Sequence, residues 1–143
     1  MSDQDKLTKL FKRWRDSLEK FVEEAVGVNA SNGLSMTTQQ RMAAREVSKL
    51  VNSKRKQRNG KKLTQEEQEY SEKIGVSIMS GQGTGKDAFC SWVMMWWLCC
   101  FPETLIPCTA PTADQIKNIL WSEFARWYNK LKKDLEHQCA FKS

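Results

Sequence analysis

The stretch that decides the fold runs from residue 74 to residue 88 and reads Ile-Gly-Val-Ser-Ile-Met-Ser-Gly-Gln-Gly-Thr-Gly-Lys-Asp-Ala. Its first half alternates Ile74, Val76 and Ile78 with smaller or more polar residues, which predicts a short strand. Glycines follow at alternate positions, and Lys86 then opens an apolar helical run. A strand, a glycine loop, a lysine and a helix in this order have the layout of a phosphate-binding loop.

The backbone explains why this pattern suits phosphate. A loop around a polyphosphate turns tightly and aims N–H groups inward, and glycine adopts the required positive φ angles at little cost. The following helix contributes the positive end of its dipole, and Lys86 is placed to reach the β- and γ-phosphates. Seven loop residues and the one after them are therefore the candidate phosphate ligands: Ser80, Gly81, Gln82, Gly83, Thr84, Gly85, Lys86 and Asp87.

The loop departs from the G-x-x-x-x-G-K-[ST] pattern at both ends. Ser80 stands where the first glycine is expected, and Asp87 replaces the hydroxyl residue that normally holds Mg²⁺. The Asp87 carboxylate can itself ligate Mg²⁺, which makes it the candidate metal ligand, but it also brings negative charge near phosphate oxygens. The pattern favours a phosphate loop over the alternative, a glycine-rich turn from strand to helix that binds no ligand.

Charge and composition narrow the class of protein. The 143 residues are enough for one domain or a piece of one, and the net charge of +6 favours polyanionic partners such as nucleic acid, although solubility alone explains a modest excess of positive charge.

Residues 54–62 carry six cations, no anion and no apolar side chain, so we expect an exposed mobile loop there. The apolar run from Ala88 to Phe101 is too short to span a bilayer and predicts a buried helix.

The spacing of the cysteines indicates the redox compartment of the protein. The five cysteines form no paired spacing and no disulfide framework, and no signal peptide is recognisable. A reducing cytosol is the simplest setting for such a chain.

Helix signals surround the glycine loop. Apolar residues at three- and four-residue steps predict an amphipathic helix over residues 3–26 that stops at Gly27. Thr37 or Thr38 is expected to cap a helix from Gln39 to about Val51, and Thr64 with Glu67 forms a capping box for a helix that ends near Lys73.

The second half of the chain predicts a helix over residues 86–98, a second strand over residues 105–109, and a last helix over residues 113–133 capped by Thr112. We therefore expect an α/β fold: a partial P-loop NTPase, with a βαβ start and parallel strands, preceded by amphipathic helices and mostly helical overall. The expected parts are a helical region, 1–73, with the basic loop 54–62; a P-loop βαβα segment, 74–133; and a tail, 134–143, without a clear signal.

Several blocks together resemble the large subunit of tailed-phage terminases, the ATP-driven motors that package DNA into capsids. The resemblance covers roughly residues 10–133, and the loop followed by A-P-T-A-x-Q and L-W-x-E is more specific than any single block. The blocks are Trp14-Arg15-Asp16, Phe21 to Gly27, Thr38-Gln39-Gln40, Gly75 to Lys86, Cys108 to Gln115 and Leu120 to Trp127.

The resemblance implies a P-loop ATPase that uses ATP and Mg²⁺ in the cytoplasm of an infected or lysogenic bacterial host. It places Gln39 or Gln40 where the family has a glutamine that reads adenine, and Ser80 through Asp87 at the phosphates and Mg²⁺. Met79 stands where the family often has an arginine. The implied partners are double-stranded DNA and either the phage portal or the small terminase subunit. The resemblance allows an oligomer and implies no association with a membrane.

The carboxylates that hydrolysis needs are not evident in the sequence. ATP hydrolysis in such folds uses a later apolar strand that ends in an acidic pair, and nothing after residue 133 has that pattern. We therefore name no catalytic residue and expect no turnover by this chain alone. Two functions stay open: the nucleotide-binding amino-terminal portion of a terminase-like motor, or a truncated terminase-like interaction protein that acts as a decoy or inhibitor by docking on another protein. A third reading is a basic nucleic-acid-binding domain that needs no nucleotide.

Overall fold

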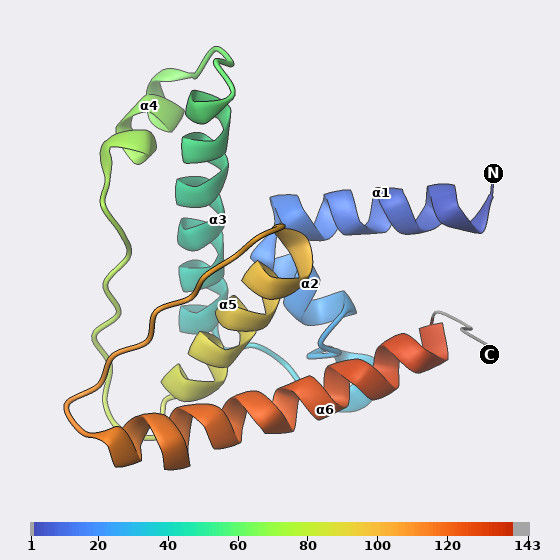
Figure 1. Ribbon diagram of the computed structural model, residues 1–143, viewed down its shortest axis with the longest axis vertical. Helices are drawn as coiled ribbons and strands as arrows, with labels where there is room; N and C mark the ends of the chain where they lie inside the picture. Colours follow the sequence, from blue (N-terminus) through green and yellow to red (C-terminus); the bar gives the residue numbers. More distant parts are fainter. Residues whose placement is uncertain (1, 139–143) are drawn as a thin grey trace.

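The computed structural model describes residues 2–138, and within that range all regular structure is helical (Figure 1). Six α-helices are joined by one 3₁₀ turn and one π-helical segment. The elements are α1 (Asp3–Asp16), α2 (Leu18–Glu24), η1 (Ala30–Asn32), α3 (Thr38–Arg58), α4 (Gln65–Glu72), α5 (Lys86–Cys100), η2 (Gln115–Leu120) and α6 (Trp121–Gln138).

The helix after the glycine loop lies at the centre of the molecule. α5 contacts α1, α2, η2 and α6, and it buries Phe89, Trp92, Met95 and Trp96 among them. The indole N–H of Trp96 donates to the carbonyl of Trp14 over 2.7 Å, so its polar atom is satisfied inside the core. The prediction of a buried helix is confirmed, and no helix in the described residues is long and apolar enough to cross a membrane.

The first predicted helix is divided into two. Residues 3–26 were expected to form one helix, but the chain breaks at Ser17, which has φ −145°. The Ser17 hydroxyl accepts from the N–H of Lys20 and so caps α2, while the N–H of Leu18 donates to the buried Ser48 hydroxyl over 2.9 Å. These bonds satisfy two of the N–H groups at the start of α2, which lets the chain turn there.

The structure of the basic segment, residues 54–62, differs from the predicted mobile loop. α3 runs to Arg58, so residues 54–58 are helical and not part of a loop. Lysine, arginine and glutamine are good helix formers, and α4 packs against this part of α3. Lys54 donates to the carbonyl of Ser71 over 3.0 Å, and Lys56 forms an ion pair with Glu67. The expectation of an independent solvated loop was wrong because α4 supplies partners for these cations.

The predicted α/β fold is also wrong. The described residues contain no strand and no sheet: residues 73–80 and 104–110 are extended but have no regular structure, and no backbone hydrogen bond joins them. A strand is defined by its bonds to a neighbouring strand, and neither segment meets one. Ile74, Met79 and Leu105 are almost fully exposed as a result. The P-loop βαβ start with parallel strands is therefore not present.

The predicted helix starts are confirmed. Thr37 and Thr64 each form a capping box, with Gln40 and Glu67 respectively. Thr112 accepts from the N–H of Gln115 over 3.3 Å at the start of the last helical run, which continues through η2 into α6. Within the predicted tail, residues 134–138 belong to α6, and residues 139–143 lie outside the described part.

Candidate phosphate-binding site

The glycine loop folds as a turn that leads directly into α5. Gly83 and Gly85 have φ values of 73° and 81°, in the left-handed region that favours glycine. Gly85 is the N-cap of α5, and no side chain caps that helix end. The first N–H groups of a 15-residue helix therefore point into the loop without a side-chain partner, next to Lys86, its first residue.

Hydrogen bonds within the loop hold it closed on itself. The Lys86 ammonium donates to the carbonyl of Ser80 over 2.8 Å. The hydroxyls of Ser80 and Thr84 lie 2.8 Å apart, and Thr84 also donates to the carbonyl of Gly81 over 2.9 Å. Lys86 is exposed and its partner is a neutral carbonyl, so an anion can replace that carbonyl with a stronger, charge-assisted bond.

Gln40 joins the start of α3 to the loop. Its side-chain oxygen accepts from the N–H of Thr37 over 2.9 Å, which fixes the orientation of the amide. Its Nε2 then donates to the carbonyl of Gly85 over 3.2 Å. Residues 45 positions apart in the chain are thereby held together at the N-cap of α5.

A cavity of about 560 Å³ lies over this junction and brings most of the predicted site residues together. Gln39, Gln40, Ser80, Thr84 and Lys86 all line it, with Gly85. Gly81, Gln82 and Gly83 belong to the same loop but do not line the cavity. Its apolar wall includes Met42, Ala43, Val76, Ile78, Met79 and Phe89. A cavity with an apolar wall and a few polar groups at one end is the usual form of a small-molecule site.

Asp87, the predicted metal ligand, also lies outside the cavity lining. Its side chain is exposed and does not line the cavity, and no group of three acidic, histidine or cysteine side chains in the described part of the chain could hold a metal ion. The protein side of a Mg²⁺ site here therefore rests on Asp87 alone.

Sequence analysis missed Glu46, a carboxylate that lines the same cavity. It accepts a 2.6 Å hydrogen bond from the Tyr70 hydroxyl, and this bond is the main cause that raises the pKa of Tyr70. A signal was available, because Glu46 lies seven residues after Gln39 and therefore on the same face of α3. The carboxylate was overlooked because it lies far in sequence from the glycine loop.

Comparison with protein families, curated sequences and solved structures finds no match to this chain.

Proposed function

We propose that the Ser80–Asp87 loop binds the phosphates of ATP, and that this chain is the amino-terminal portion of a DNA-packaging motor ATPase like the large subunit of phage terminases. The observation that supports it best is the bond between Gln40 and Gly85. It brings the glutamines that the resemblance assigns to adenine into one cavity with the loop that it assigns to phosphate.

Each residue has a distinct part in the proposed binding. The free N–H groups at the start of α5 and the loop amides would donate hydrogen bonds to the β- and γ-phosphates, and Lys86 would release the Ser80 carbonyl to contact them. Gln39 and Gln40 would face the base against the apolar wall. Mg²⁺ would arrive bound to the nucleotide, with Asp87 as its protein ligand.

Titration with a fluorescent ATP analogue, with and without Mg²⁺, tests the proposal. Lys86→Ala should weaken binding at least tenfold because it removes the only lysine or arginine among the residues that line this cavity. Lys133→Ala removes another exposed lysine, from α6, and is the matched control, expected to bind as the wild-type chain does. Equal affinity in the wild-type and Lys86→Ala chains would overturn the proposal.

The exposed apolar residues favour a second function, that of a non-catalytic interaction protein. Ile74, Met79 and Leu105 expose almost their whole side chains on the two extended segments, and such surfaces are common where another protein docks. A decoy or inhibitor of this kind has no need of nucleotide. A chain that binds no ATP analogue but forms a defined complex with another terminase component would support this function over the first.

A further inference from the structure

We infer that Glu46 recognises the ribose of the bound nucleotide by accepting hydrogen bonds from its 2′- and 3′-hydroxyls. The inference rests on the proposed nucleotide site and adds a residue that neither the local pattern nor the resemblance assigns. Glu46 lines the cavity of about 560 Å³ over the glycine loop, and it is the only acidic residue among those that line it. Its chemistry therefore differs from that of every other group in the cavity.

The Glu46 carboxylate has a free hydrogen-bond acceptor. Its Oε2 accepts from the Tyr70 hydroxyl over 2.6 Å, whereas Oε1 has no hydrogen-bond or ion-pair partner in the described part of the chain. An ionised carboxylate can accept about four hydrogen bonds, so most of this capacity is unused. Glu46 is half-buried, so a ligand that covers it displaces water and must itself supply donors.

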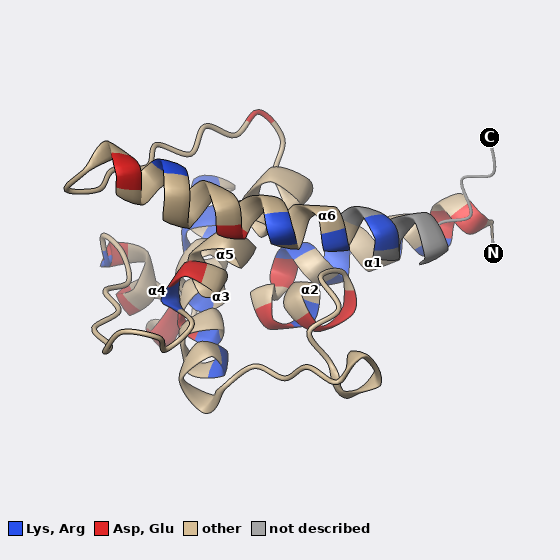
Figure 2. Cartoon of the chain, turned by 90° about the horizontal axis from the view of Figure 1, so that it is seen from below, with Lys and Arg blue, Asp and Glu red and all other residues tan. Residues whose placement is uncertain are grey.

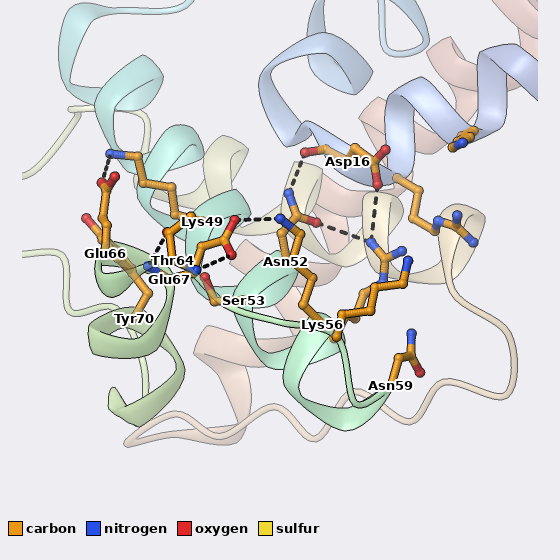
Figure 3. Close-up of a pocket in the computed structure, with 14 residues that line it drawn as sticks. Asp16, Lys49, Asn52, Ser53, Lys56, Asn59, Thr64, Glu66, Glu67 and Tyr70 are labelled. Atoms are coloured by element: carbon orange, nitrogen blue, oxygen red, sulfur yellow. Dashed lines mark hydrogen bonds and ion pairs between the residues drawn. The ribbon is translucent and has the colours of Figure 1, made fainter.

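No cation pairs with Glu46 among the described residues. Figure 2 shows lysines and arginines recurring along α3, and Glu46 is the only acidic residue of that helix. Lys49, one turn further along α3, lies 3.3 Å from Glu66, and Figure 3 shows this pair beside Tyr70 in a separate cleft between α1, α3 and α4. The carboxylate therefore brings an unpaired negative charge to the cavity that is proposed to bind phosphate.

This negative charge limits which ligands fit. A carboxylate repels phosphate, so the cavity suits a ligand that places phosphates at the loop and hydrogen-bond donors at Glu46. α3 begins beside the start of α5, where Gln40 bonds Gly85, and runs away from it (Figure 1). Glu46 lies six residues beyond Gln40, about 9 Å along the helix, which is close to the distance between the terminal phosphates and the ribose of an extended nucleoside triphosphate.

Among the parts of a nucleotide, the ribose matches Glu46 best. Its two adjacent hydroxyls are two O–H donors, and a carboxylate is the group that accepts from a ribose hydroxyl in dinucleotide-binding folds. Adenine offers a single amino group, and the proposed site already sets the base against the apolar wall with Gln39 and Gln40. The site should therefore prefer ribonucleotides to nucleotides that lack these hydroxyls.

Isothermal titration calorimetry of the full chain with Mg²⁺ and unlabelled nucleotides tests this inference. The ligands are ATP, 2′,3′-dideoxy-ATP, which lacks both hydroxyls, and purine riboside triphosphate, which lacks only the amino group. The wild-type chain should bind ATP at least tenfold more tightly than dideoxy-ATP, because hydrogen bonds to a charged acceptor are lost.

Glu46→Ala should change the two affinities differently. It should weaken ATP binding about tenfold but leave dideoxy-ATP binding as tight as before or tighter, because the variant also loses a charge that repels phosphate. A side chain with a purely structural role would weaken both nucleotides equally. The ratio of the affinities for ATP and purine riboside triphosphate should stay at its wild-type value.

Tyr70→Phe is the matched control. It removes the same hydrogen bond between α3 and α4 but keeps the carboxylate, and Tyr70 does not line the cavity. This variant should keep the preference for ATP over dideoxy-ATP.

The outcomes separate this inference from the proposed function. Equal wild-type affinities for ATP and dideoxy-ATP, a preference that survives in Glu46→Ala, or an equal loss of preference in Tyr70→Phe would overturn the ribose contact while leaving ATP binding intact. A Glu46→Ala variant that loses discrimination of the amino group instead would assign the carboxylate to the base and overturn the inference as well. A wild-type chain that binds none of the three nucleotides would overturn the proposed function together with the ribose contact.

Discussion

At the scale of single residues, the site depends on one glycine more than on any other. Gly85 has φ +81°, and a Cβ built on it would lie 2.4 Å from Nε2 of Gln40. Gly81 is in the same loop, but its φ is not positive and a Cβ there would meet nothing within 4 Å. The three glycines of the sequence pattern are therefore not equivalent, and only the structure distinguishes them.

Gly85→Ala should weaken both the loop and the site. The left-handed backbone costs a non-glycine residue about 1–2 kcal/mol, and the clash must also displace the Gln40 amide. We expect a lower free energy of unfolding by chemical denaturation and a loss of ATP-analogue affinity. Gly81→Ala is the matched control and should leave both nearly unchanged. Equal behaviour of the two variants would contradict the role given to Gly85.

At the scale of the elements, an ionic cluster holds α2 against α3. Arg41 pairs with Glu19 over 2.8 Å and also with Glu23, and Arg45 contacts Glu19 over 2.8 Å. The Glu19 side chain is only 15% exposed. The hydrogen bond from Arg45 is the main cause that lowers the pKa of Glu19, and Arg41 contributes further.

Glu19→Gln should destabilise the fold at neutral pH by about 1 kcal/mol, the upper range for pairs that remain partly exposed. Because folding lowers the pKa of Glu19, its stabilising effect is complete above the ordinary pKa of a glutamate and disappears as the pH falls through the lowered value. Urea unfolding at a series of pH values should therefore show the two chains converging in acid. A difference that stayed constant down to the most acidic pH would contradict this assignment.

The elements also show how far the sequence predicts the fold. The capping box at Thr64 was predicted, and so was a threonine cap at residue 37 or 38, because a cap depends on residues only three positions apart. The break between α1 and α2 at Ser17 could not be predicted in this way, because the Ser48 hydroxyl that supports it lies 30 residues from Leu18 in the chain. The end of α3 was missed for a similar reason: the partners of its cations lie on α4.

At the scale of the whole molecule, the residues of the two predicted strands could not show by themselves that neither segment pairs with a neighbour in the described part of the chain. Alternation in residues 74–78 indicates an extended segment, and the segment is extended, but a sheet also needs a second strand in contact with it. In the site, local pattern located the loop and the resemblance added Gln39 and Gln40. Neither the local pattern nor the resemblance could show that Glu46 lines the same cavity while Asp87 does not.

Polar substitution of Ile74 and Leu105 tests whether the two extended segments are exposed to solvent or packed in a sheet. The paired changes Ile74→Asn and Leu105→Asn should alter the free energy of unfolding by no more than about 0.5 kcal/mol each, because both side chains are exposed to solvent. Met95→Ala, in the core and 1% exposed, should cost about 2–5 kcal/mol in the same denaturant experiment. A cost of the latter size at position 74 or 105 would mean that the segment is packed.

The most direct test of the proposed nucleotide site is an ¹H–¹⁵N NMR titration of the chain with ATP and Mg²⁺. The account predicts that the amide signals of Gly81, Gly83, Gly85 and Lys86 shift together, and that the shifts disappear in Lys86→Ala. The amides of Asn59 and Lys61, which do not line the cavity over the glycine loop, should move little at the nucleotide concentration that saturates the loop. Loop signals that stay fixed up to millimolar ATP, or shifts confined to residues outside the loop, would contradict the proposed nucleotide site.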